Sequence, residues 1–346
     1  MILILHNEPG AATSGALCPE SDAEVLEQVA AVAAALRARG VAVTSAGVRH
    51  VRDVPGVLAA TAATTVVNLV ECLGRAHDMA PYVPALCAAF GKACTGCDSA
   101  CLSLTLDKWR TRAVLHAAGV PVTAGVCMHP SDMSDKSDMS DLSDEQLLAR
   151  LPAGPLIVKP LSTDGSEGID ARLSVFDAAG PAVLDRARFV HEQFHQPALI
   201  EQFHGNREYQ AALLEQDGRV IVLAVAEIDF SALAPGQRPL LDYAAKWHYA
   251  SDVYVRTPRV VPARIGAACA ARLATMARTA WQATGCNDYA RVDFRAVGED
   301  APVVLEVNAN PDIGPDSGYA AALAHAGISY EDFAAMLIHN AGARAQ

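Results

Sequence analysis

The 346-residue sequence has little positive charge and no long apolar run. Its 27 Lys and Arg against 39 Asp and Glu give a formal net charge of −12. Nucleic-acid binders normally carry a basic patch or stripe, so this balance argues against that class. A membrane span needs about 18 consecutive apolar residues, and none occurs. The apolar start MILILH is too short for a signal peptide and lacks a basic lead-in. We therefore expect a cytoplasmic protein with no nucleic-acid or membrane partner.

The cysteines also lack the spacing of a metal site or redox motif. Nine are present, without a CxxC pair or a His/Cys ligand pattern. Cys94, Cys97 and Cys101 lie among small residues, as buried cysteines often do, and we interpret the cysteines as reduced thiols. With 51% hydrophobic and 19% charged residues, the chain is globular and long enough for two or three domains.

Strands and helices alternate over the first hundred residues. Apolar runs predict strands at 2–5, 41–44, 64–70 and 92–95. Helices are predicted from a Ser21 or Asp22 N-cap to a stop at Gly40, and over 81–90. This order indicates a parallel, doubly wound, Rossmann-like domain over 1–104. Ligands gather at the carboxyl ends of such strands, after Leu5 and Leu69.

A predicted helix from Thr105 to Ala118 leads into a repeat of Ser-Asp triplets. The repeat is rich in Asp but lacks the glycine turn and distal Glu of an EF-hand loop. Its composition buries too little surface to order itself. We interpret residues 131–145 as a mobile, solvated linker that is dispensable for chemistry.

Two alternating runs between 289 and 308 carry polar side chains where a buried sheet is expected. Arg291 and Asp293 share one strand face, and Glu306 and Asn308 share one face of the next strand. A Gly-Glu-Asp stretch can turn the chain between them. Paired as a hairpin, they present the oxygen ligands that Mg²⁺ prefers. The alternative is a solvated, salt-bridged face, but a structural ion pair needs no amide oxygen two residues after Glu306.

The stretch GPLIVKPLSTDGSEGID predicts a buried strand at 156–158 that runs into Lys159. Gly165 and Gly168 follow, on either side of Ser166. Glycines allow backbone N–H groups to close on a phosphate, and the lysine adds positive charge. The Walker A pattern is absent, and a flexible turn is an equal alternative for this loop.

Two further stretches suit a nucleotide. A strand at 198–200 ends at Glu201 and Phe203, and Glu208 follows; backbone groups and carboxylates there suit an adenine edge and a ribose. Taken singly, these glutamates fit surface positions better. Lys246 lies in LLDYAAKWHY, which has no clear helical or strand period. This stretch is either a mobile lid over phosphates or a packed loop.

Taken together, these stretches resemble the ATP-grasp superfamily, specifically its D-alanine–D-alanine ligase branch. The resemblance covers nearly the whole chain, in the family's order and at about its spacings. The matching segments are VVNLVE, ACTGCDSACLSLTLDKWRTRAVLHAAGVPV, LIVKP, LIEQFHGNRE, DYAAKW, ARVDF, LEVNANP and GISYEDF.

The resemblance implies an α/β, ATP-grasp fold of three subdomains. These are an N-terminal Rossmann-like substrate domain over 1–104, a central subdomain over 105–195, and a C-terminal subdomain over 196–346 with the metal and catalytic site. It also implies an ATP-dependent ligase that forms an amide through an acylphosphate, with ATP and two Mg²⁺ as cofactors. A carboxylic acid and an amino acid or amine are the implied substrates, and a homodimer the implied assembly.

The resemblance assigns roles to individual residues. Residues implied for ATP are Lys108, Lys159, Glu201, Phe203, Glu208 and Lys246. Residues implied as Mg²⁺ ligands are Asp293, Glu306 and Asn308. Residues implied for catalysis are Arg291, Ser166 and Asp312, the last through nearby backbone N–H groups. Residues implied for substrate binding are Glu20, Glu71, His77 and Ser317.

The sequence departs from the family at the amino-acid pockets. In NPDIGPDSG, Asp312 replaces a glycine whose N–H faces the oxyanion. The family's His-Gly-x-x-Gly-Glu-Asp loop is replaced by VECLGRAHDMAP, with Glu71, Arg75, His77 and Asp78 as candidate substitutes. We therefore expect amino-acid-like substrates of specialised metabolism that are not both D-alanine. A cell-wall D-alanine ligase, a kinase on the same scaffold and a catalytically silent ATP-binding module are the alternatives.

Overall fold

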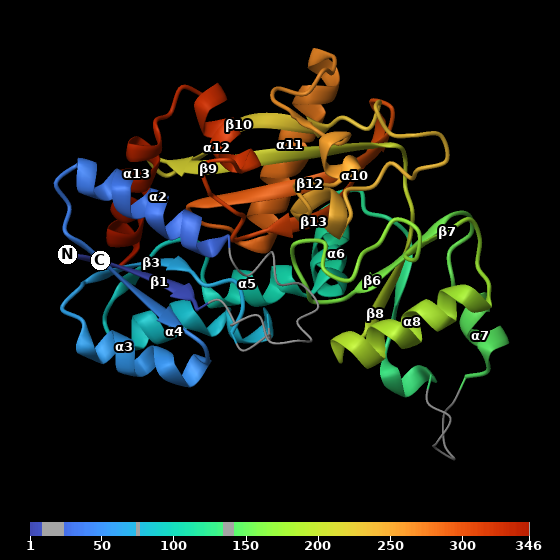
Figure 1. Cartoon of the computed structure of the whole chain (residues 1–346), viewed down its shortest axis with the longest axis horizontal. Coiled ribbons are helices and arrows are strands. Elements are labelled where there is room, and N and C mark those ends of the chain that lie inside the picture. Colours follow the sequence, from blue (N-terminus) through green and yellow to red (C-terminus); the bar gives the residue numbers. More distant parts are fainter. Residues whose placement is uncertain (9–23, 74–76, 134–141, 346) are drawn as a thin grey trace.

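The computed structural model describes residues 1–8, 24–73, 77–133 and 142–345, and three sheets organise them (Figure 1). A four-stranded parallel sheet has the order β2-β1-β3-β4. A four-stranded antiparallel sheet has the order β5-β8-β6-β7. A five-stranded antiparallel sheet has the order β11-β10-β9-β12-β13. Among the described residues, no helix is both long and apolar enough to cross a membrane.

The parallel sheet confirms the predicted doubly wound N-terminal region. Its strands are β1 (Ile2–Asn7), β2 (Val43–Val48), β3 (Thr65–Leu69) and β4 (Ala93–Cys94). Ile2 and Ile4 pack toward α2 (Val25–Ala38), whereas Leu3 and Leu5 pack toward α3 (Val54–Ala60) and α4 (Tyr82–Ala89). The C-terminal helix α13 (Tyr330–Arg344) packs on the α2 side, which the sequence pattern did not indicate.

The helix α2 ends where the sequence predicted. Gly40 follows it with a φ of +74°, a conformation that glycine adopts without strain. Its described part has Glu24 at the N-cap, while the predicted caps Ser21 and Asp22 lie outside the described residues.

The predicted helix 105–118 is two helices instead. The first, α5 (Ser99–Leu106), ends before Asp107, and α6 (Lys108–Ala117) begins after it. The Asp107 carboxylate accepts a hydrogen bond from the Arg110 N–H at 2.9 Å, so it caps α6 and interrupts the helix. This break places Lys108 at the first turn of α6.

The central sheet contains β5 (Gly125–Met128), β6 (Leu156–Pro160), β7 (Val175–Phe176) and β8 (Ala198–Gln202). The helix α8 (Pro181–Phe194) packs against β6 and β8, with α7 (Asp144–Ala149) beside it. Because β8 pairs with β5 and β6, the predicted boundary between 195 and 196 separates this strand from its sheet. We propose that the central subdomain ends after Gln202.

The predicted linker over 131–145 is too long at both ends. Residues Pro130–Met133 form a short 3₁₀ helix. Ser143 accepts a hydrogen bond from the Gln146 N–H, and Gln146 accepts one from the Ser143 N–H. This capping box starts α7 and lets Leu147 reach the core. The rest of the repeat, 134–141, lies outside the described residues.

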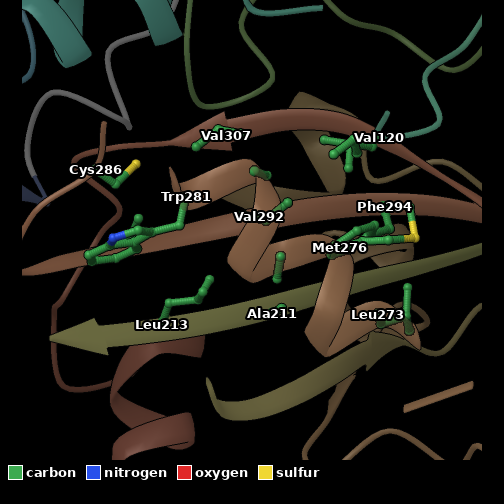
Figure 2. Packing of buried hydrophobic residues seen from close by; sticks show 14 of the residues in the cluster. Val120, Ala211, Leu213, Leu273, Met276, Trp281, Cys286, Val292, Phe294 and Val307 are labelled. Atoms are coloured by element: carbon green, nitrogen blue, oxygen red, sulfur yellow. The ribbon is translucent and has the colours of Figure 1, made fainter. Parts of the chain in front are cut away.

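The C-terminal sheet contains β9 (Arg207–Gln216), β10 (Arg219–Ile228), β11 (Arg259–Val260), β12 (Tyr289–Val297) and β13 (Asp300–Asn308). Its helices are α9 (Tyr243–Trp247), α10 (Asp252–Val255), α11 (Ala267–Thr284) and α12 (Gly318–His325). Figure 2 shows Val292 and Phe294 of β12 meeting Met276 and Trp281 of α11 in the core. Since strand side chains alternate, burying this face turns Arg291, Asp293 and their neighbours to the opposite face.

The predicted hairpin is confirmed as β12 and β13. In its register, Arg291 is opposite Asn308 and Asp293 is opposite Glu306. Gly298, with a φ of +59°, lies in the turn between the strands.

Folding brings Cys286 next to Cys97 and Cys101, which are far from it in the sequence. The sulfur atoms of Cys97, Cys101 and Cys286 lie within 4.8 Å of one another, in the same core as Trp281. Burial raises the pKa of the Cys97 thiol, whereas hydrogen bonds with Cys101 and Cys97 lower the pKa of Cys286. Cys97, Cys101 and Cys286 are free thiols, and we interpret this cluster as core packing.

Candidate active site

The polar face of the β12–β13 hairpin unites four of the predicted residues. Arg291 donates to both carboxylate oxygens of Asp293, Nε to Oδ1 at 2.7 Å and Nη2 to Oδ2 at 2.8 Å. The Asn308 side-chain amide donates to Asp293 Oδ2 at 3.3 Å and to Glu306 Oε1 at 3.2 Å. Two carboxylates and an amide therefore lie in mutual contact.

Four cations surround Glu306. Lys108 Nζ lies 3.8 Å from Glu306 Oε2, and it also donates to the Thr163 carbonyl. Burial alone would raise the pKa of Glu306, but Lys108, Lys159, Lys246 and Arg291 lower it to about 2. These four cations therefore favour the ionised form of the Glu306 carboxylate.

All six residues predicted for ATP line one small cavity of about 80 Å³. Within it, Lys159 Nζ lies 2.6 Å from Glu201 Oε2, and the Thr123 hydroxyl donates to Glu201 Oε1 at 3.0 Å. Ser166, Asp293 and Glu306 line the same cavity. The site therefore joins the polar edge of the C-terminal sheet to the end of the central one.

Arg295 also lines this cavity, although the sequence analysis did not predict it as a site residue. It is 2% exposed and donates to Glu208 at 3.3 Å and to the carbonyls of His204, Gly205 and Pro239. Its guanidinium lies 4.7 Å from the centre of the Phe203 ring. Arg295 thus holds Phe203 and Glu208 in place. The available signal was its spacing, because Arg295 shares a strand face with Asp293.

Two segments meet over the small cavity, the glycine loop (residues 163–169) and the Lys246 segment (residues 240–247). The Ser166 hydroxyl donates to the Leu241 carbonyl at 3.0 Å. Trp247 Nε1 donates to the Gly165 carbonyl at 2.7 Å, and the Tyr243 N–H donates to the Ile169 carbonyl at 3.2 Å. The two segments are therefore closed on one another.

The Lys246 segment is more ordered than its sequence pattern predicted. The Asp242 carboxylate accepts from the Ala245 N–H at 2.9 Å and caps the short helix α9. Burial lowers the pKa of Lys246 in this helix, an effect that Glu306 and Asp293 oppose.

A larger cavity of about 760 Å³ adjoins the small one, and Lys246 lines both. Predicted residues that line the larger cavity are Arg291, Asn308, Asp312, Glu71, His77 and Ser317. Glu20 and Arg75 lie outside the described residues, and Asp78 is not part of the lining. Glu24, the N-cap residue of α2, also lines the cavity, although the sequence pattern did not indicate it. Arg259 of β11 lines the cavity as well.

Carboxylates gather at one end of the larger cavity. Burial, followed by Asp312 and Glu71, raises the pKa of Glu24 to about 8. Burial and Asp312 raise the pKa of Glu71 to about 7, although a hydrogen bond from Gln28 opposes the shift. These groups disfavour one another's charge, so a cationic ligand group would stabilise their ionised forms.

His77 and Ser317 are both engaged within the protein. His77 Nε2 lies 3.2 Å from Glu167 Oε2. Burial opposes its charge, but the bond to Glu167 and nearby Asp164 raise the pKa of His77 to about 9. The Ser317 hydroxyl accepts from the Ala320 N–H at 3.0 Å and caps α12. The Asp312 carboxylate accepts from the Gly314 N–H at 2.7 Å.

The donor set on the hairpin fits a hard divalent cation. Asp293 and Glu306 supply carboxylate oxygens, and the Asn308 amide supplies one when its oxygen turns toward them. Thiol and imidazole donors, which softer metals favour, do not line the small cavity among the described residues, apart from His204 at its edge.

Comparisons with known proteins agree with this geometry. Residues 114–339 match the family model described as D-ala D-ala ligase C-terminus. A D-alanine–D-alanine ligase of Caulobacter sp. is 30% identical over 333 residues, covering 94% of this chain and 92% of the relative. An uncharacterized protein, y4sG, of Sinorhizobium fredii is 30% identical over 77% of this chain and 70% of its own length.

A solved structure shares the whole fold. The D-alanine–D-alanine ligase of Bacillus anthracis complexed with ATP superposes with a TM-score of 0.73 at 16% identity, covering 100% of this chain and 98% of that one. The chain thus belongs to the D-alanine–D-alanine ligase family and is an ATP-dependent ATP-grasp ligase that forms carbon–nitrogen bonds with amino acid-type substrates.

Proposed function

We propose that this ligase transfers the γ-phosphoryl group of ATP to an amino-acid-like carboxylate and joins the product to an amine. The observation that carries the proposal is that Lys108, Lys159 and Lys246 line one cavity with Glu306, and that Lys246 and Arg291 line the adjoining one. A triphosphate and a carboxylate repel each other, so bringing them together requires concentrated positive charge.

The small cavity would hold the nucleotide. Lys108 and Lys159 would contact the phosphates, with the glycine loop and Ser166 over them. Glu201 and Phe203 would contact the adenine, and Arg295 would hold Glu208 toward the ribose. Lys246 lines both cavities, so it would contact the γ-phosphoryl group both on ATP and on the substrate carboxylate.

Asp293, Glu306 and Asn308 would hold two Mg²⁺ ions. When bound, magnesium supplies charge neutralisation between the phosphates and orients the γ-phosphoryl group. The protein contributes a Glu306 carboxylate whose pKa is lowered, so that this ligand is ionised at neutral pH.

The first step forms a bond from a carboxylate oxygen to the γ phosphorus and breaks the bond to ADP. In the second step, the amine nitrogen attacks the acyl carbon, phosphate leaves and the nitrogen loses a proton. Arg291 and backbone N–H groups near Asp312 would stabilise the oxyanion between these events. The closed glycine loop and Lys246 segment would keep water from the acylphosphate.

The larger cavity would hold the amino-acid-type substrates. Its volume of about 760 Å³ falls in the roughly 300–1,000 Å³ range of pockets for drug-sized ligands. Two D-alanines would leave much of it unfilled. Glu24 and Glu71 would receive a substrate ammonium group, and Ser317 would donate to a carboxylate. We therefore propose substrates of specialised metabolism, at least one of them larger than D-alanine.

A panel of carboxylic acids and amines, scored by ADP release and by product mass, tests this function. We expect ADP release that depends on both partners and a product whose mass is their sum less one water. Release that needs only two D-alanines would favour a cell-wall ligase. A phosphorylated acid as the end product would indicate a kinase. Nucleotide binding without any turnover across the panel would indicate a silent ATP-binding module.

The family resemblance also leads us to propose a homodimer. Sedimentation of the purified chain measures this directly, and a species of about 36 kDa alone, the mass of one chain, would contradict it.

A further inference from the structure

Gln210 lies in β9, and its side-chain oxygen, Oε1, is buried without a hydrogen-bond partner among the described residues. The residue is 4% exposed. Leaving a buried acceptor without a partner costs about 1–3 kcal/mol. A group of this kind requires an explanation, such as an ion or ligand that completes it.

The sheet register places Gln210 beside the hairpin carboxylates. Gln210 on β9 is opposite Asp293 on β12, and Asp293 is opposite Glu306 on β13. The three residues therefore form one row across three strands, on the same face. Directly opposed side chains have Cβ atoms about 4.5–5.5 Å apart. Gln210 also lines the small cavity together with Lys108 and Lys246.

The alternating pattern of β9 explains why Gln210 is on this face. Its neighbours Tyr209 and Ala211 point into the core beneath the sheet, with Phe294 of β12. A core-facing residue at position 210 would break that pattern, whereas a site-facing glutamine preserves it. The residue on the other side of the row, Ala226 of β10, has no side-chain donor for the amide oxygen.

We propose that the Gln210 amide oxygen helps to hold the divalent cation at Asp293 and Glu306. An amide oxygen is a neutral, hard donor, which suits Mg²⁺ and Mn²⁺. It would add an oxygen without adding charge to a row that already holds two carboxylates. This inference rests on the proposed function, because that function places the cation on the hairpin.

Manganese provides the probe, because its free concentration is read by electron paramagnetic resonance without any turnover. Mn²⁺ is titrated into the full chain with a non-hydrolysable ATP analogue, comparing wild type with Gln210→Met, which is similar in length but lacks the amide. We expect Gln210→Met to weaken Mn²⁺ binding about 10-fold, the lower end of the effect of residues that support metal ligands. Gln216→Met, near the end of the same strand, is the matched control and should bind as wild type does.

A second variant keeps the test decisive if Gln210→Met does not fold. Gln210→Glu retains an oxygen and adds charge, so it should bind Mn²⁺ at least as tightly as wild type. Weaker binding by Gln210→Glu, or unchanged binding by folded Gln210→Met, would overturn the assignment.

The nucleotide and the cation are separated by repeating the titration with the analogue alone. We expect Gln210→Met to bind metal-free analogue as wild type does, and an equal loss there would show that Gln210 serves the nucleotide instead. Failure of the proposed metal site itself looks different. In that case wild type would bind Mn²⁺ no better than Asp293→Asn, and both proposals would fall.

Discussion

The two cavities of the site differ in how their acidic groups are paired. In the small cavity, Glu201 lies against Lys159, Glu208 against Arg295, and Asp293 against Arg291. In the larger cavity, Glu24 and Glu71 have no Lys or Arg within 4.0 Å among the described residues, and their pKa values are raised to about 8 and 7. The acidic groups of the small cavity are thus paired with cations before a ligand arrives. In the larger cavity, Glu24 and Glu71 would become fully ionised only when a cationic ligand group binds.

The largest expected effect follows from removing the acid at the centre of the small cavity. Glu306→Gln keeps the shape but leaves Lys108 and its neighbouring cations without their shared carboxylate. We expect ADP formation to fall about 10³-fold, comparable with losing a main electrostatic contributor. Steady-state ADP release measures this. Glu299→Gln, near the exposed hairpin turn, is the control, and equal rates for both variants would contradict the site assignment.

Lys246→Met tests the lysine that lines both cavities. It removes positive charge from both, so we expect kcat/KM for ATP to fall about 10²-fold, while KM for the amine also rises. Initial-rate kinetics with each substrate varied in turn provide the measurement. An effect limited to one substrate would show that Lys246 serves a single cavity.

The His77–Glu167 pair predicts a pH-dependent part of the stability. The pKa of His77 is raised to about 9, so its contribution is fully present below the unfolded pKa of about 6.5 and is lost as pH rises through 9. We expect wild type to lose roughly 2 kcal/mol of stability relative to His77→Gln over this range. Urea unfolding at several pH values measures the difference, and a constant difference would refute the pairing.

Glu71→Gln should change stability by a similar amount, and it should make the folded protein more stable at neutral and alkaline pH. The raised pKa of Glu71 means that the folded protein disfavours its ionised form. Wild-type stability therefore falls relative to the variant as pH rises from about 4.5 to 7, and the difference stays constant above that. We expect the variant to be roughly 2 kcal/mol more stable at pH 8, by urea unfolding. If Glu71→Gln were less stable than wild type at pH 8, the acidic groups of the two cavities would not differ as described above.

Local sequence pattern was enough to predict which polar residues of the hairpin share a face in the small cavity. The alternation around Arg291 and Asp293 fixed which side chains share a face, and a short turn left only one close pairing with Glu306 and Asn308. The larger cavity was harder, because its walls come from loops and from helix ends far apart in the sequence. Glu24 is an example, since it reaches the cavity only because α2 lies across the end of β1.

Other features depend on contacts that no local pattern encodes. The packing of α13 on the N-terminal sheet joins the two ends of the chain. The role of Arg295 depends on three carbonyls from two separate loops. The missing partner of Gln210 is visible only when three strands are in register.

The closure of the glycine loop on the Lys246 segment also affects how fast a nucleotide can arrive. A volume of about 80 Å³ holds only a few water molecules, so the ATP that we propose for this cavity would enter after these segments separate. Separation breaks the bonds from Ser166, Trp247 and Tyr243, each contributing about 0.5–1.5 kcal/mol. On this proposal the receptive conformation would be a minor population, and opening, instead of diffusion, would limit association with ATP.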